Sequence, residues 1–156
     1  MISQTAEYAL RAIVHMATNP AEPQTAQQIS EGTHVPVPYL SKVLQSLVRG
    51  NLVLSQRGLH GGFTLRKCPE DLTVYEIVQA VDPIQRILTC PLGLKAHGTH
   101  LCPLHRRLDD AMDQVERSFR ATTIAEVLSE PTTSKPLCPF PVEVASGAKT
   151  ALPKSS

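Results

Sequence analysis

Aromatic side chains are scarce in this sequence. Its 156 residues include no tryptophan, three tyrosines and three phenylalanines, so aromatics make up 4% of the chain. Hydrophobic residues nevertheless amount to 42%, which is enough for the core of one domain, with or without an appendage. Such a core must be built from aliphatic side chains, which fits a small helical protein better than a β-sandwich.

No hydrophobic run approaches the ~18 residues that a membrane-spanning helix needs. The apolar N-terminal segment contains Glu7 and Arg11, and it lacks the basic start and small-residue cleavage site of a secretory signal. We therefore expect a cytoplasmic protein without membrane contact. In that compartment the four cysteines favour metal ligands, redox thiols or inert core positions over structural disulfides.

Acidic residues are missing from one stretch of an otherwise balanced chain. The net charge is only +1, so the bulk composition does not indicate a nucleic-acid-binding protein. Between Gly32 and Pro69, however, there is no Asp or Glu. The same 38 residues hold five basic side chains, Lys42, Arg49, Arg57, Arg66 and Lys67. A local excess of positive charge is what contact with DNA phosphates requires.

The spacing of apolar residues predicts a mainly helical protein with one small hairpin. The expected helices cover residues 2–18, 26–32, 38–48, 74–82, 103–119 and 122–130. Thr25 and Thr73 are the expected N-caps of two of them, and Gly32 is the expected stop of the second helix. Two β-prone runs, residues 52–54 and 63–67, flank a glycine-rich connection and predict the hairpin.

The order of two helices, a turn, a third helix and a hairpin is that of a winged helix-turn-helix. The third helix is the candidate recognition helix. Near its N-terminus, Pro38, Tyr39, Ser41 and Lys42 can reach base edges or phosphates. The same pattern would also suit a solvated basic face on an ordinary helical domain.

The hairpin supplies a second candidate DNA contact. Arg57 and Gly58 stand at its expected tip, where two further glycines follow. Glycines allow close approach of the backbone, and an arginine at such a tip can enter a minor groove. These residues therefore predict that the hairpin is a DNA-binding wing.

The stretch CPLGLKAHGTHLCPLH, residues 90–105, gathers two cysteines and three histidines. Thiolates and imidazoles suit iron–sulfur clusters, and two Cys with two His are also a common zinc set. Two plain thiols could instead form a disulfide on oxidation. The residues alone leave a metal site, a redox switch and a polar loop open. Cys68, beside Pro69 at the end of the hairpin, is expected to be structural.

One apolar stripe follows the long helix that begins at Pro103. It consists of Leu104, Leu108, Ala111, Met112, Val115 and Phe119. A single stripe on so long a helix indicates that the helix lies against a partner. From Pro131 onward the chain turns to Pro, Ser, Thr and Ala, which predicts a disordered tail over residues 131–156.

Residues 2–130 resemble the IscR/NsrR family of bacterial winged-helix regulators. The resemblance rests on segments in the family's order and spacing: EYALRAIVHMA, AQQISE, VPVPYLSKVLQSLVRGNLV, SQRGLHGGFTL, TVYEIVQAVD and TTIAEVL. It implies a DNA-binding transcriptional regulator, a repressor rather than an enzyme. It also implies a homodimer in which the long helix crosses its mate, reading a roughly palindromic operator. Several members have a Glu where Ser41 stands, so target preference is not carried over, and His60 replaces a common glycine.

The resemblance also implies an iron–sulfur sensor in the loop. Cluster-binding members use three cysteines, twelve residues from first to third, and Cys90 and Cys102 have that separation. One variant adds a His three residues after the third Cys, which His105 matches. The middle cysteine is missing here, because Ala96 stands about where it would be. His97 or His100 could replace it.

A further ligand is implied from the first helix of the partner subunit, at the position of Glu7. The alternative for Glu7 is a surface pair with Arg11, four residues on. One redox sensor of the family has a His where Arg11 stands, so its ligand set is not copied. The favoured cofactor is a 2Fe-2S cluster, with zinc less favoured. Its candidate ligands are Cys90, Cys102, His105, His97 and Glu7.

The expected organisation therefore has three parts. A winged helix-turn-helix DNA-binding domain covers residues 1–83. The cluster-binding loop and the dimerisation helix occupy residues 84–130, and the Pro-rich tail follows.

Overall fold

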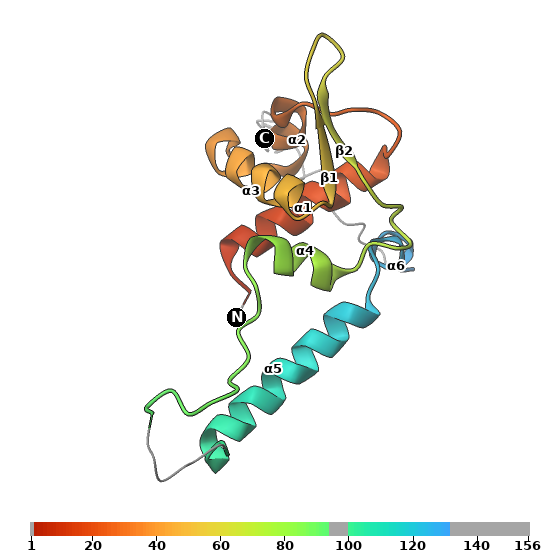
Figure 1. The fold of residues 1–156 in the computed structure, drawn as a ribbon. Helices are drawn as coiled ribbons and strands as arrows, with labels where there is room; N and C mark the ends of the chain where they lie inside the picture. Colours follow the sequence, from red (N-terminus) through yellow and green to blue (C-terminus); the bar gives the residue numbers. More distant parts are fainter. Residues whose placement is uncertain (1, 94–99, 132–156) are drawn as a thin grey trace, which may run out of the picture.

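The computed structural model describes residues 2–93 and 100–131 (Figure 1). Its elements are α1 (Gln4–Thr18), α2 (Ala26–Thr33), α3 (Val37–Arg49), β1 (Val53–Gln56), β2 (Gly62–Leu65), α4 (Val74–Val81), α5 (Pro103–Ala121) and α6 (Ile124–Ser129). The predicted class, mainly helical with a small hairpin wing, is confirmed. The predicted tail lies outside the described residues except for Pro131. Within the described residues, no helix is long and apolar enough to cross a membrane.

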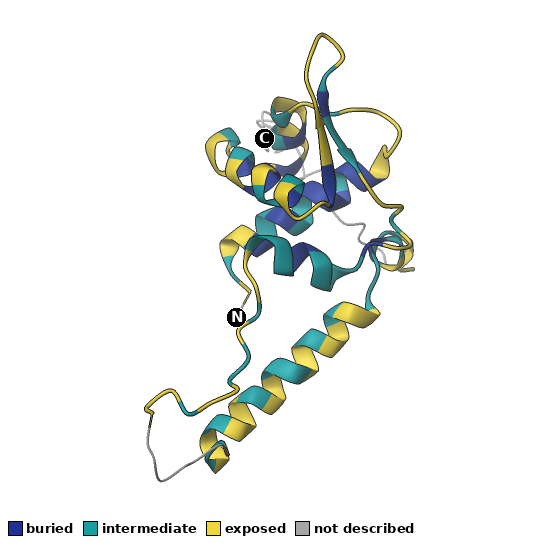
Figure 2. Cartoon of the chain, in the orientation of Figure 1, coloured by how far each residue is buried: buried dark blue, intermediate teal, exposed yellow. Residues whose placement is uncertain are grey.

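An aliphatic core lies where α1 meets α2, α3 and α4. Three alanines on α1, Ala6, Ala9 and Ala12, are at most 1% exposed, and their small size lets the neighbouring helices approach closely. From α3, Leu40 and Leu44 are fully buried against them. Figure 2 shows the buried positions concentrated in this part of the molecule. The scarcity of aromatics is thus compatible with a well-packed core.

The wing is an antiparallel pair in which Val53 faces Leu65 and Gln56 faces Gly62. The segment before α2 adds a third backbone to it. The Gln24 N–H donates to the Phe63 carbonyl at 3.0 Å, and the Phe63 N–H donates to the Gln24 carbonyl at 2.7 Å. A Cβ at Gly62 would lie 2.8 Å from the Gln24 carbonyl carbon. This position therefore requires glycine, and the close approach fixes the turn-side end of β2 against the segment before α2.

Helix starts are specified locally by capping boxes. Thr25, Thr73 and Thr123 each accept a hydrogen bond from the backbone N–H three residues on, and a Gln or Glu there reaches back. The N-caps predicted at Thr25 and Thr73 are confirmed. α1 begins at Gln4 rather than at residue 2, because the Ser3 hydroxyl accepts from the Ala6 N–H at 3.2 Å.

The expectation that Gly32 ends the second helix is wrong. α2 continues through Thr33 and ends at His34, which has a left-handed φ of 54°. Gly32 has a packing role instead: an added Cβ would lie 2.6 Å from His15 Nδ1 and closer still to Cε1. The His15 ring of α1 therefore occupies the space that a side chain would take on α2. Burial lowers the pKa of His15.

α5 forms an arm, and none of its 19 residues is buried (Figure 2). The chain returns from the arm to the winged helix at Thr123, which pairs with Thr73 in a backbone bridge. The Val74 N–H donates to the Thr122 carbonyl at 3.0 Å. Ile124 then enters the core at 1% exposure. The arm thus leaves the winged helix after α4 and rejoins it at the start of α4.

Candidate DNA interface and candidate cluster site

The predicted recognition helix corresponds to α3, which starts from Pro36 as N-cap. Leu40 and Leu44 point into the core, so the opposite face is presented to solvent. Pro38, Tyr39 and Lys42 are exposed on that face, and Ser41 is half-buried beside them. The structure therefore leaves the predicted contact residues accessible at the N-terminal end of the helix.

A cluster around Tyr8 supports the start of α3. The Tyr8 and Tyr39 rings lie 6.5 Å apart in a tilted arrangement, which aromatic pairs favour. The Arg11 guanidinium lies 6.0 Å from the centre of the Tyr8 ring, and Gln4 Nε2 donates to the Tyr8 hydroxyl at 2.8 Å. Sequence reasoning did not identify Tyr8 as the partner of Tyr39.

The wing ends in a tight turn over residues 58–61. The Gly61 N–H donates to the Gly58 carbonyl at 2.9 Å, so Leu59 and His60 form the apex. Leu59 is 94% exposed, and Arg57 and His60 are also exposed. Leu59 was missed by sequence reasoning, although a large apolar residue between glycines could have identified it.

The basic side chains of the acid-free stretch are distributed over α3 and the wing. Lys42, Arg57 and Arg66 are exposed. Arg49 is exposed at the end of α3 and donates to the Ser46 hydroxyl at 3.0 Å. Lys67 forms an ion pair with Glu76 of α4, so most of its charge is compensated within the domain.

The two cysteines of the loop flank the residues that the structure does not describe. Cys90 is half-buried and opens a turn in which the Gly93 N–H donates to its carbonyl at 3.0 Å. Cys102 is the N-cap of α5. Its Sγ lies 3.3 Å from His105 Nδ1, one helical turn further on. A thiol and an imidazole are thus already adjacent at the start of the arm.

Among the described residues, neither His100 nor Glu7 joins this pair in a metal-binding group. His97 lies outside the described residues, and His100 is exposed. Glu7 accepts a hydrogen bond from Arg11 Nε at 2.6 Å on α1, the intrahelical pair that was the alternative for it. Among the described residues of the single chain, no three His, Cys, Asp or Glu side chains are grouped as a metal site. The ligand roles of Cys90, His97 and Glu7 therefore stay predictions.

The side chains of Cys102 and His105 can be compared with the ligands that an iron–sulfur cluster or zinc requires. Cys102 Sγ and His105 Nδ1 lie 3.3 Å apart, and iron–sulfur clusters and zinc both accept sulfur and imidazole donors. The donor chemistry at the start of α5 fits either group.

An ion-pair cluster joins the loop to the arm and was not foreseen. Arg86 Nε and Nη2 donate to the two carboxylate oxygens of Asp109 at 2.7 and 2.8 Å, and Nη1 donates to Asp113 at 2.7 Å. The backbone N–H of Ile87 donates to Asp109 at 2.9 Å. The Arg86 hydrogen bonds lower the pKa of Asp109 to about 2. No local sequence signal links residues 23 positions apart.

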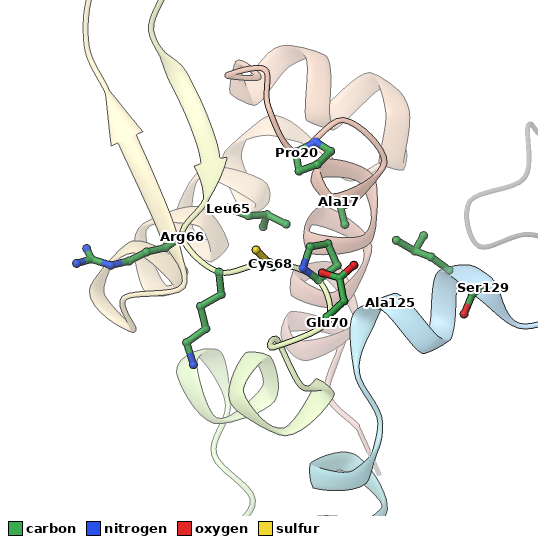
Figure 3. Close-up of a pocket in the computed structure, with 11 residues that line it drawn as sticks. Ala17, Pro20, Leu65, Arg66, Cys68, Glu70, Ala125 and Ser129 are labelled. Atoms are coloured by element: carbon green, nitrogen blue, oxygen red, sulfur yellow. The ribbon is translucent and has the colours of Figure 1, made fainter.

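A cavity of about 680 Å³ lies at the base of the wing (Figure 3). Its walls come from the end of β2 with the segment after it, the end of α1, and α6. Cys68 lines it and is exposed, and the structural role expected for this cysteine stays a prediction. Arg66 and Glu70 lie at its border, and Leu128 contributes an apolar wall.

An apolar groove of about 620 Å³ follows the arm. Val78 and Ile84 line it on one side, and Met112, Val115 and Phe119 of α5 line it on the other. Leu104 and Leu108 continue the apolar stripe toward the N-terminus of α5 at 64% and 44% exposure. The stripe predicted from sequence is therefore present and uncovered along part of its length.

A helix-turn-helix followed by a hairpin wing and a basic exposed face defines a winged-helix DNA-binding protein. A sequence model of the Rrf2 family, described as iron-dependent transcriptional regulator, matches residues 2–130. The chain belongs to the Rrf2 family. The resemblance to IscR/NsrR regulators is thereby confirmed, and the protein is a DNA-binding transcriptional regulator rather than an enzyme.

Individual relatives agree with this assignment. The chain is 26% identical over 132 residues to an HTH-type transcriptional regulator of Aquifex aeolicus (strain VF5), covering 83% of this chain and 92% of that protein. It is 27% identical over 129 residues to the transcriptional regulator IscR of Escherichia coli O1:K1 / APEC, covering 82% and 80%. The structure of CymR, the global cysteine regulator of B. subtilis, shares the fold with a TM-score of 0.67 at 22% identity, covering 81% and 95%.

Proposed function

We propose that the protein is a dimeric repressor whose operator affinity is set by an iron–sulfur cluster, most simply a 2Fe-2S cluster. It would act on operator DNA in the cytoplasm and respond to redox state, nitric oxide or iron–sulfur status. The observation that carries the proposal is the Cys102–His105 pair at 3.3 Å, at the junction between the loop and the arm.

DNA contact is assigned to α3 and the wing. Pro38, Tyr39, Ser41 and Lys42 face a major groove, and their position at the start of α3 suits contacts to base edges and phosphates. The wing residues Arg57, Gly58 and His60 face the adjacent minor groove. The support for this assignment is their exposure on a basic, acid-free stretch.

The homodimer is supported by the arm. A helix of 19 residues without one buried side chain leaves its apolar stripe in water unless a second copy covers it. Two arms crossing would set the distance between the two α3 helices. The operator half-sites would then lie about one helical turn, roughly 34–36 Å, or a multiple of it apart.

The cluster would be held by Cys90, Cys102 and His105, with His97 or His100 and the partner's Glu7 as further candidates. When bound, it would supply a one-electron redox response, and imidazole ligation would raise its potential relative to thiolate ligation. Cys102 and His105 occupy the first turn of α5. A change in how they are held therefore acts directly on the helix that sets the spacing of the recognition helices.

A thiol switch is the second candidate function. Cys102 supports it, because its thiol is half-buried rather than part of the core, and Cys90 is half-buried as well. In this case Cys102 and Cys90 would form a disulfide on oxidation. Zinc held by the same donors would make the loop a structural staple.

Anaerobic purification distinguishes these functions. A coloured protein with about two irons and two sulfides per subunit is expected for a 2Fe-2S site, and Cys102→Ser should lose both. Colourless protein with stoichiometric zinc would contradict the cluster. A reversible disulfide with neither metal would establish the thiol switch.

The DNA assignment is tested with a duplex that the protein itself selects from a random-sequence pool. Arg57→Ala should weaken binding about tenfold or more, since a good groove contact contributes about 1–3 kcal/mol. Arg117→Ala is the matched control, because Arg117 lies on the arm with a side chain 79% exposed. Equal binding by wild type and Arg57→Ala would remove the wing from the interface.

The dimer is tested by Leu108→Glu, which places a charge in the exposed stripe of α5. Sedimentation equilibrium should show a dimer for the wild type and a monomer for the variant. The winged helix should stay folded, because Leu108 is not part of its core. A wild-type monomer at micromolar concentration would overturn the dimer.

A further inference from the structure

We propose that Arg86 is a positioning residue that couples the loop to the arm, so that the state of the cluster site is transmitted to α5. This inference rests on the proposed function, because it concerns how that site is read. It assigns to Arg86, Ile87 and Asp109 a role that the spacing of the cysteines does not suggest.

The geometry is that of a clamp, defined as the contacts of Arg86 and the Ile87 N–H with Asp109, Asp113 and Glu116. The guanidinium binds both oxygens of Asp109 side-on, and the same carboxylate accepts the Ile87 N–H. Three hydrogen bonds thus converge on one side chain. Bidentate pairing of this kind fixes orientation as well as distance.

The clamp extends along one face of α5. Asp109, Asp113 and Glu116 are spaced four and three residues apart, so their carboxylates lie on one stripe. Arg86 reaches Asp113 at 2.7 Å and Glu116 at 3.5 Å. Arg86 thus brings a cation from outside the helix to all three carboxylates. Arg86 therefore ties residue 86 to a stretch of α5 about 10 Å long, seven residues at 1.5 Å each.

The clamp restricts both flanking cysteines. Cys90 follows Ile87 by three residues, which span at most about 11 Å when extended. Cys102 precedes Asp109 by seven residues, about 10.5 Å along the helix. Both cysteines are therefore joined to the clamp by short segments, Cys90 through Ile87 and Cys102 through the start of α5. A rearrangement between them pulls on the clamp before it reaches any other contact of the arm.

Two of the three carboxylates of the clamp have further partners within α5. Asp113 also pairs with Arg117 at 2.6 Å, and Glu116 pairs with Arg120 at 2.7 Å. Arg86 is the one cation of the clamp that comes from the loop side. Removing Arg86 or Arg117 therefore deletes one positive charge beside Asp113, but of these two side chains Arg86 alone connects the loop to the arm.

The experiment compares wild type, Arg86→Gln and the matched control Arg117→Gln. Each protein is prepared in the cluster-loaded and the metal-free form, and the dissociation constant for the selected duplex is measured for both. The wild-type ratio of the two constants defines the switch. We expect Arg86→Gln to reduce this ratio at least about fivefold, within the usual range of allosteric coupling, and Arg117→Gln to leave it within about twofold.

A second measurement tests whether the clamp forms in the metal-free protein. In the metal-free protein, amide hydrogen exchange at Ile87 should be at least about tenfold faster in Arg86→Gln than in wild type or Arg117→Gln, because the acceptor Asp109 is no longer held. Should Arg86→Gln fold poorly, Asp109→Asn removes the same pair from the other side. It is expected to show the same loss of switching with unchanged iron content.

The outcomes distinguish a failure of the role of Arg86 from a failure of the proposed function. A switching wild type with an equal ratio in Arg86→Gln and Asp109→Asn overturns the role of Arg86 and leaves the proposed function standing. A wild type without iron, or with equal affinities in both forms, overturns the proposed function and this inference together. Loss of switching in Arg117→Gln as well would show a general charge effect and also overturn the inference.

Discussion

The winged helix and the arm are held together in different ways. In the winged helix, α1 to α4 bury a continuous aliphatic core, and α6 returns to add Ile124 to it. The arm buries no residue of α5. Its described attachments are the Arg86 clamp, the Arg120 guanidinium 3.4 Å from the centre of the Tyr75 ring, and the groove beside α4.

This difference means that the residues that stabilise the winged helix are not those that hold the arm. A packed core has few alternative arrangements, because each side chain fills a defined space. A helix held by charge and by a partner can change position without unfolding the rest. The winged helix is thus rigid, and the arm, which we propose sets the spacing of two recognition helices in a dimer, is adjustable.

The largest expected difference in stability is between truncating a leucine of the winged helix and truncating a leucine of the arm. Leu44→Ala in α3 should lower the free energy of unfolding by about 2–5 kcal/mol, because Leu44 is fully buried. Leu108→Ala in α5 should change it by less than about 0.5 kcal/mol where the chain is monomeric. Urea unfolding over a range of protein concentrations measures both. A large loss from Leu108→Ala in the monomer would show that the arm shares the core.

The capping residues give a smaller effect. Thr73→Ala should cost about 1 kcal/mol, since it removes the cap of α4. Thr5→Ala on the exposed side of α1 is the control and should change stability by less than about 0.5 kcal/mol. Thermal unfolding monitored by circular dichroism compares them, and equal melting temperatures would count against the cap.

Gly32→Ala tests the contact with His15. An added methyl group meets the imidazole ring, so we expect a loss of about 1 kcal/mol from overpacking. In a His15→Ala background the ring is absent, and the same change should stabilise by up to about 1 kcal/mol because alanine favours helix. A stabilising effect in both backgrounds would mean that the ring yields without strain.

The smallest effect is the pH dependence of the two regions. Burial lowers the pKa of His15 below its ordinary 6.5, so the unfolded chain binds a proton more readily and stability falls as pH drops below about 6.5. His15→Gln should remove this slope in urea midpoints taken between pH 8 and 5.

Asp109 acts in the same direction as His15, but in a lower pH range. Its pKa is lowered from 3.8 to about 2, chiefly by the Arg86 hydrogen bonds. Its contribution is therefore complete above pH 4 and is lost only as pH falls through about 2. The clamp should add no slope between pH 8 and 5, and a slope that Asp109→Asn removes in that range would contradict it.

Local signals explain most of what sequence could predict. The motifs TAQQ, TVYE and TIAE (from Thr25, Thr73 and Thr123) specify capping boxes within four residues. The spacing of three from Cys102 to His105 places both on one helical turn, as the structure confirms. Gly32 was misinterpreted because a local rule for helix ends competed with a contact to His15, seventeen positions earlier.

Distant pairings could not be predicted in the same way. In the sequence, Arg86 is one basic residue in the segment after α4. Asp109 is one of several acidic residues on a helix that is expected to be exposed. Only the fold brings them together. Tyr8 and Tyr39 likewise meet because α1 crosses α3. The middle of the loop has neither periodicity nor capping signals, which is why its ligand set remains a prediction.

The bridge between Thr73 and Thr123 has a practical consequence for engineering. Because the chain rejoins the winged helix beside the start of α4, the arm is topologically an insertion. Its two ends are separated by about 12 Å, the length of the eight-residue α4. A flexible linker of about four or five residues spans that distance. Replacing residues 83–121 by such a linker should yield a monomeric DNA-reading module that retains α6 and is insensitive to the loop.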